Sequence, residues 1–108
     1  MQRRVVITGI GLVSALGIGT QDNWKALVSG TSGVTRISRF DVSTYAAQIA
    51  AEVKGFDPLN WVEKKEVKKM DLFIQYAIAA AQFAMDDSKL PITDANAHEV
   101  GAFIGSEI

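Results

Sequence analysis

Residues 71–88 of this 108-residue chain read DLFIQYAIAAAQFAMDDS, and this stretch decides which folds are open to the sequence. At 100° per residue, a few polar side chains fall within roughly 60° of one another, and apolar side chains fill most of the remaining circumference. The polar residues are Asp71, Gln75, Gln82 and Asp86. A helix that is apolar nearly all round is buried, and its alanines let other backbones approach closely. We therefore predict a core helix over 71–88 with one narrow solvent-facing stripe.

Three shorter stretches around this helix have the composition of strands. Residues 5–8 (VVIT) and 100–105 (VGAFIG) are apolar runs, typical of strands that are covered on both faces of a sheet. Residues 47–54 alternate in polarity, which indicates a strand with one wet face. Its buried face is expected to comprise Ile49, Ala51 and Val53, and its wet face to carry Gln48, Glu52 and Lys54.

Two further helices are predicted between these strands. The first runs from about residue 21 to 29, with Thr20 as its N-cap and Gly30 just past its end. Its buried stripe is expected to comprise Trp24, Leu27 and Val28. The second begins after Asp57, an N-cap, with Pro58 at the first helical position. Strands that alternate with helices place the chain in the α/β class.

The composition excludes several classes of protein. Hydrophobic residues make up 48% of the chain and charged residues 21%, as in globular proteins. A net charge of -1 gives no general attraction to nucleic acid or to an anionic membrane. The chain has no cysteine, which excludes disulfides, thiolate metal sites and a cysteine nucleophile within it. Because His98 is the only histidine, we expect no metal site and no cofactor.

The N-terminal segment allows two interpretations besides a strand. Arg3 and Arg4 before an apolar run have the outline of a secretory signal, but glycines interrupt the helix that a signal requires. The segment TGIGLVSALG (8–17) also resembles a dinucleotide-binding turn. However, Ser14 replaces the third glycine, and Asp41 is too far along to meet a ribose. We prefer a buried strand that glycines turn sharply, with a nicotinamide-dependent reductase as an alternative function.

Residues 63–69 (EKKEVKK) concentrate positive charge. On a helix, lysines four positions apart are neighbours and repel each other. Such pairs would be Lys64 with Lys68 and Lys65 with Lys69. The simplest interpretation is a solvated helix face on which Glu63 and Glu66 relieve some of the repulsion. The functional interpretation is a docking patch that steers an acidic partner.

Four groups of residues together resemble the opening of the β-ketoacyl-[acyl-carrier-protein] synthases of the elongating type II, in order and over the whole chain. They are RVVITGIG (4–11) with Ser14 and Gly17; WKAL (24–27) with Gly30, Ser32, Gly33, Phe40 and Asp41; KE (65–66) and KKMD (68–71) with Phe73, Tyr76 and Ala77; and Gly101 with IGS (104–106).

This resemblance implies a fold and a chemistry. Residues 1–108 would be the incomplete N-terminal portion of a synthase domain, with a partial thiolase-like α/β fold, in a cytoplasmic homodimer. The family's cysteine thiolate accepts an acyl chain from acyl carrier protein, and malonyl carrier protein is decarboxylated to extend it. Because the catalytic cysteine and histidines have no match here, we expect this chain alone to be inactive. A non-catalytic carrier-binding module is the alternative.

The resemblance also implies two kinds of site, and neither involves nucleic acid or membrane. Lys65, Lys68 and Lys69 match basic residues that contact the acidic helix of the carrier protein. Ile108 matches an apolar residue of the acyl pocket. Glu107 stands where the family usually has glycine. A carboxylate beside a fatty-acyl pocket would be costly to bury, so this departure puts the pocket in doubt.

Overall fold

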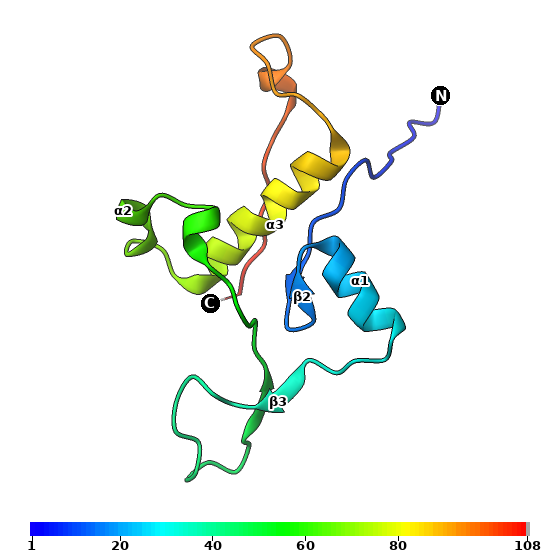
Figure 1. Ribbon diagram of the computed structural model, residues 1–108. Coiled ribbons are helices and arrows are strands. Elements are labelled where there is room, and N and C mark those ends of the chain that lie inside the picture. The colour runs from blue at the N-terminus through cyan, green and yellow to red at the C-terminus, as the bar shows by residue number, and fades with distance from the viewer. Residues whose placement is uncertain (108) are drawn as a thin grey trace.

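The computed structural model describes residues 1–107, and helix α3 (Leu72–Ser88) runs through its middle (Figure 1). The helix predicted over 71–88 is confirmed at both ends. At its N-terminus, the Asp71 carboxylate accepts a hydrogen bond from the Leu72 N–H at 2.7 Å. At its C-terminus, Lys89 adopts a left-handed conformation. The other elements are β1 (Val13–Ser14), β2 (Gly17–Ile18), α1 (Thr20–Val28), β3 (Val34–Arg36), β4 (Ile49–Ala51), η1 (Pro58–Asn60), α2 (Lys64–Val67) and η2 (Ala97–Glu99).

A small hairpin leads into α1. Strands β1 and β2 are antiparallel, with Ser14 opposite Gly17. Asn23, in the first turns of α1, is buried and donates to the carbonyl oxygens of Gly17 at 2.9 Å and Gly19 at 2.8 Å. Its own side-chain oxygen accepts a hydrogen bond from the Ser14 hydroxyl. One amide side chain therefore ties the hairpin to the helix.

The predicted N-cap of this helix was wrong by one position. Gly19 caps α1, and the Thr20 hydroxyl donates instead to the Ile10 carbonyl at 3.0 Å. The threonine thus fastens the helix to the preceding segment, while its backbone is already helical. The predicted stripe is also not buried, because Trp24, Leu27 and Val28 are each at least 60% exposed.

Two glycines let the N-terminal segment cross α3 at close range. A Cβ atom at Gly9 would overlap the carbonyl oxygen of Ala84, and one at Gly11 would overlap that of Ala80. Neither glycine has a positive φ angle. The prediction that these glycines turn the segment sharply was therefore wrong. Glycine is needed at both positions because the segment lies in close contact with the backbone of α3. The prediction that the alanines of α3 allow close approach of another backbone is confirmed.

Strands β3 and β4 form a two-stranded ribbon that projects away from α3 (Figure 1). The strand predicted over 47–54 is confirmed at Ile49–Ala51, but Ile49 and Glu52 lie on the opposite sides from those predicted. Ile49 is 66% exposed, whereas Glu52 is only 8% exposed. Glu52 can be buried because Ser38 donates two hydrogen bonds to its carboxylate, from the N–H at 2.9 Å and the hydroxyl at 2.8 Å.

Two short helices precede α3. Asp57 caps η1 as predicted, accepting from the Leu59 N–H at 3.0 Å, with Pro58 at the first position. This element is a single 3-10 turn. Helix α2 holds only four residues, so the helix expected under the lysines is shorter than the run 63–69. None of the helices formed by the described residues could cross a membrane.

The strands predicted at 5–8 and 100–105 pair with nothing in the described part of the chain. Both are extended and open, and Val5 and Phe103 are each 95% exposed. They flank an apolar groove of about 520 Å³ on the surface of α3. Helix α3 itself buries only Gln75 and Ala79. These segments have the composition of a core, yet nothing among residues 1–107 covers them.

The surface of residues 1–107 is too large for a self-contained domain. It measures 8849 Å² for a chain of 11.7 kDa, whereas a compact monomer of that mass would expose roughly 5,900 Å². The radius of gyration is 17.1 Å, against about 13 Å for a compact domain of this length. Val42 and Ala79 are the buried apolar residues of the described part. This arrangement therefore needs further protein surface to cover it.

We expect the 108-residue chain on its own to self-associate, because a large exposed apolar surface is unusual on soluble monomers. Sedimentation velocity at micromolar concentration should show dimers or larger species. A monomeric species with a cooperative thermal transition would contradict this expectation.

Gly11→Ala should destabilise the chain by about 1–3 kcal/mol, because the new methyl group overlaps the backbone of α3. Urea unfolding of the associated chain at one fixed protein concentration, followed by helical circular dichroism, would measure the change. Gly105→Ala is the matched control, since no atom lies near its added Cβ, and it should change stability by less than about 0.5 kcal/mol. Equal effects of the two substitutions would show that the contact with α3 is not tight.

Candidate functional site

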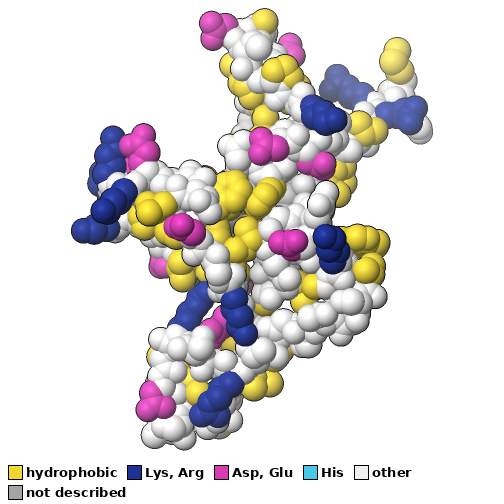
Figure 2. Space-filling view, viewed as in Figure 1, with side chains coloured by type: hydrophobic (Ala, Val, Ile, Leu, Met, Phe, Trp, Pro, Cys, Tyr) yellow, Lys and Arg dark blue, Asp and Glu magenta, His cyan; other side chains and the backbone are white. Residues whose placement is uncertain are grey.

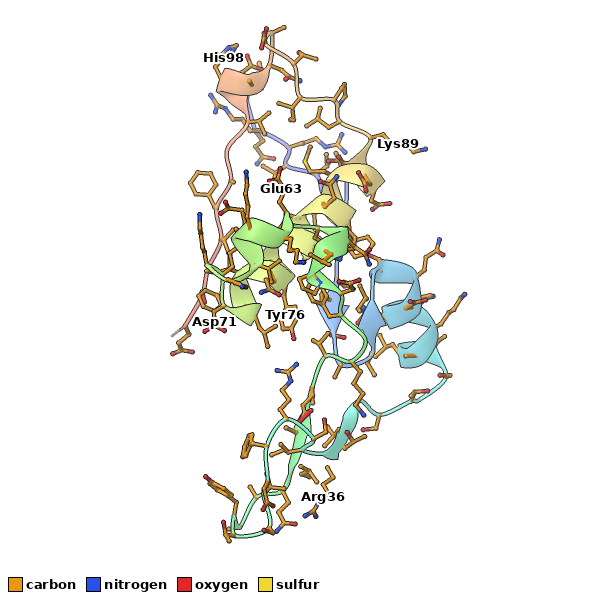
Figure 3. All side chains as sticks on the ribbon, turned by 60° about the vertical axis from the view of Figure 1, so that its left-hand side comes forward. Arg36, Glu63, Asp71, Tyr76, Lys89 and His98 are labelled. Carbon is orange, nitrogen blue, oxygen red and sulfur yellow. The ribbon has the colours of Figure 1, made fainter. Side chains whose placement is uncertain are left out.

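The predicted basic cluster lies on and just after α2, and we call Lys64, Lys65, Lys68 and Lys69 the lysine patch. All four side chains are exposed. Figure 2 shows them as a dark blue group over α2, at the side of the molecule. In Figure 3, Glu63 and Asp71 mark the two ends of this segment. The structure thus brings together the three predicted docking residues, Lys65, Lys68 and Lys69.

The glutamates of the segment neutralise only part of this charge. Lys65 Nζ lies 3.1 Å from a carboxylate oxygen of Glu63, and Lys69 Nζ lies 3.4 Å from one of Glu66. Exposed pairs of this kind contribute at most about 1 kcal/mol and exchange readily. Four lysines against two glutamates leave a net charge of +2 over residues 63–69. The patch therefore keeps a positive field toward solvent.

The spacing predicted for the lysines differs from the observed one. Helix α2 ends at Val67, with Lys68 as its C-cap. The chain then continues as a tight turn, in which the Lys69 N–H donates to the Glu66 carbonyl at 2.9 Å. The predicted helical pairs with i,i+4 spacing are therefore not formed on one continuous helix.

A second cluster, which the sequence analysis missed, joins the ribbon to α3. The guanidinium of Arg39 donates to the Tyr76 hydroxyl at 2.9 Å and to the Val53 carbonyl at 3.2 Å. The Tyr76 ring packs edge-on against Phe56, with centroids 4.9 Å apart. Arg39 and Tyr76 are 37 positions apart, so no local pattern could have revealed the contact.

Glu52 belongs to the same region, and its pKa is lowered below its ordinary value of 4.5. The main cause is the hydrogen bond from the Ser38 backbone, followed by that from the Ser38 hydroxyl. Burial acts in the opposite direction, and the Arg39 charge adds a smaller lowering. The carboxylate is thus held ionised as a structural group of the ribbon.

The glycine segment 8–17 lacks the geometry of a dinucleotide site. Such a site needs a strand that turns directly into a helix, whereas this segment crosses α3 and enters the β1–β2 hairpin. Asp41, the distant candidate for a ribose contact, accepts a hydrogen bond from the Ser43 N–H at 3.0 Å within its own loop. The nicotinamide-dependent alternative is therefore not supported.

Residues of the C-terminal segment 100–104 line the open groove on α3. Ile108, the predicted acyl-pocket residue, lies outside the described residues, and Glu107 is exposed. His98 lies on η2, 3.6 Å from the Glu99 carboxylate, at the end of the molecule opposite Arg36 (Figure 3).

Comparison with known proteins agrees with the resemblance found in the sequence. The family described as "Beta-ketoacyl synthase, N-terminal domain" matches residues 2–108. The chain belongs to the β-ketoacyl synthase family. Its 3-oxoacyl-[acyl-carrier-protein] synthase 2 relatives include those of Coxiella burnetii (50% identical), Vibrio harveyi (49%) and Synechocystis sp. (42%). Each match covers 99% of this chain and 26% of the relative, so the chain spans about a quarter of their length.

A solved structure shows the fold of this β-ketoacyl synthase segment. "The ishigamide ketosynthase/chain length factor" superposes with a TM-score of 0.76 at 38% identity, over 84% of this chain and 23% of that one. The predicted α/β class, with a partial thiolase-like fold, is confirmed.

Glu52→Gln should make the stability less dependent on pH. Because folding lowers the pKa of Glu52, its contribution is present above about pH 4.5 and is lost as the pH falls through the lower folded-state value. Urea unfolding between pH 7 and pH 3 should show that the wild-type advantage over the variant is largest at neutral pH. A difference that stays constant over this range would exclude a structural role for the ionised carboxylate.

Proposed function

We propose that this chain forms the N-terminal part of a 3-oxoacyl-[acyl-carrier-protein] synthase, an acyltransferase of fatty-acid elongation. Its 40–50% identity to relatives with that name, over nearly its whole length, carries the proposal. In this reaction a cysteine thiolate displaces the carrier thiol from acyl carrier protein and forms an acyl-enzyme thioester. Malonyl carrier protein loses carbon dioxide, and the resulting enolate attacks the thioester, releases the thiolate and yields 3-oxoacyl carrier protein.

The chain's own contribution is to scaffold and dock rather than to react. It has no cysteine and a single, exposed histidine, so it supplies neither the nucleophile nor the histidine pair of this chemistry. By itself it should give no condensation product from acyl and malonyl carrier proteins. The same lack of catalytic residues would suit a non-catalytic carrier-binding module, which remains the second candidate.

The lysine patch is the proposed docking surface for acyl carrier protein. Lys65, Lys68 and Lys69 are exposed, lie on one short segment and keep a net positive field. Charges at the rim of an interface accelerate encounter and orient the partners, while their interactions stay sensitive to salt. An acidic carrier that must bind and leave in each cycle suits such a surface.

Other parts of the proposal rest on the family resemblance alone. They are Ile108 as a wall of the acyl pocket, a homodimeric assembly and a cytoplasmic location. Glu107 conflicts with the pocket, because a carboxylate at its edge disfavours a bound acyl chain.

A hybrid enzyme would test the docking surface. In it, residues 2–106 of this chain replace the matching segment of the C. burnetii synthase, which leaves out Glu107. Changing Lys65, Lys68 and Lys69 together to Glu should raise the apparent KM for acyl carrier protein roughly tenfold, equivalent to about 1.4 kcal/mol. Activity with a small acyl thioester should change little, and added salt should reduce the difference between parent and variant.

The matched control reverses three exposed cations outside the patch, Arg3, Lys25 and Lys89, and so makes the same change in net charge. An equal rise in KM for the control would assign the effect to overall charge. Equal loss with both substrates would show that the lysines serve folding, and no loss with either would leave the patch a solvated face.

A further inference from the structure

The carbonyl oxygen of Met70 has an unusual position at the end of the lysine patch. The Met70 N–H closes the turn after α2, donating to the Val67 carbonyl at 3.3 Å. Helix α3 then begins past Asp71, and the N–H groups of Ile74 and Gln75 both donate to the Asp71 carbonyl, at 3.1 and 3.2 Å. The Met70 carbonyl therefore lies one residue ahead of the N-cap, Asp71. No backbone N–H group of the described residues reaches it.

The side chain of Gln75 supplies the missing donor. Its Nε2 lies 3.1 Å from the Met70 carbonyl oxygen, five positions back along the chain. The helical pattern placed Gln75 on the solvent-facing stripe of α3, yet it is only 5% exposed. The sequence prediction for this residue was therefore wrong. The side chain points back toward the turn at Met70, where its hydrogen bond satisfies the Met70 carbonyl; an unpaired carbonyl would be destabilising.

This placement leaves one polar atom unpaired. Gln75 Oε1 is buried and has no hydrogen-bond partner among the described residues. A buried amide oxygen without a donor destabilises the folded state, whereas a glutamine facing solvent would carry no such penalty. The hydrogen bond to Met70 is therefore the interaction that accounts for a polar side chain here.

We propose that Gln75 is a positioning residue for recognition of the carrier protein. Its side chain anchors the turn that contains Lys68 and Lys69, and the anchor is the rigid helix α3. This inference rests on the docking function proposed for the lysine patch. Helix α2 has only four residues and cannot hold its own end in place, because short helices have little stability alone. Pinning the Met70 carbonyl orders the backbone under the lysines without changing their charge.

This role differs measurably from that of the lysines. Removing lysine charge changes both the encounter and its dependence on salt. Removing the Gln75 donor leaves every charge in place, so the long-range attraction stays. Only the bound geometry becomes less ordered, which raises KM while the slope of KM against salt remains that of the parent.

The test uses the hybrid enzyme with Gln75→Leu, which removes the donor together with the unpaired oxygen at similar volume. The apparent KM for acyl carrier protein should rise about fivefold, as expected for loss of one ordering hydrogen bond. The kcat value and the activity with a small acyl thioester should stay within about twofold, because the reacting groups are untouched. Gln75→Met, which also lacks the donor at similar volume and adds no charge, should show the same rise.

Gln82→Leu is the matched control on the same helix. Gln82 is exposed and donates to Asp86 at 2.8 Å, so its replacement also removes a side-chain hydrogen bond, but away from the patch. A KM for Gln75→Leu equal to that of Gln82→Leu would overturn the proposal, and so would an unchanged KM for Gln75→Met. Equal loss with both substrates would show a purely structural role.

The lysine variant separates this inference from the docking function. If charge reversal of the lysines raises KM and both Gln75 variants leave it unchanged, docking stands and the positioning role fails. If charge reversal itself has no effect on KM, the docking function fails, and the positioning role is overturned with it.

Discussion

The contact between the glycines of the N-terminal segment and the alanines of α3 determines where the other elements can lie. Gly9 and Gly11 meet the backbone at Ala84 and Ala80 with no room for a side chain between them. Because the chain enters its hairpin directly after this crossing, the position of β1 and β2 follows from it. Asn23 then fastens α1 to the hairpin, so the N-terminal third of the chain is built outward from one backbone crossing.

The ribbon and the turn after α2 also reach α3, by hydrogen bonds alongside the aromatic pairs Phe56–Tyr76 and Trp61–Phe83. Arg39 ties the ribbon to Tyr76, and the Gln75 amide holds the turn that follows α2. Each of these elements is too short to bury an apolar face alone. Hydrogen bonds of defined length and direction therefore set their orientation together with these aromatic contacts. Such contacts suit a surface that must present a few lysines in a fixed arrangement.

Much of the local structure could be predicted from the sequence, because caps and helical periodicity are properties of neighbouring residues. The limits of α3, the cap at Asp57 and the centre of β4 all followed from such signals. Family membership followed from four groups of residues in register, although each group alone is modest. The lysine patch was visible as a run of charge, although its helix proved shorter than its pattern indicated.

What could not be predicted depends on partners distant in the sequence. Glu52 and Gln75 were placed in solvent because periodicity assigns polar residues to the outside, yet hydrogen bonds to Ser38 and Met70 bury both. The opposite error affected Trp24, whose apolar character predicted burial that residues 1–107 do not provide.

The open groove and the excess surface have a consequence for biosynthesis. In the relatives, this segment makes up 26% of a chain, which leaves about 300 residues to be translated after it. At roughly 5–20 residues per second, a ribosome takes on the order of 15–60 s to complete them. Throughout that interval the nascent segment would carry apolar surface with nothing yet synthesised to cover it. A protein built on this plan would depend on chaperones near the ribosomal exit tunnel while the remaining three quarters of the chain are synthesised.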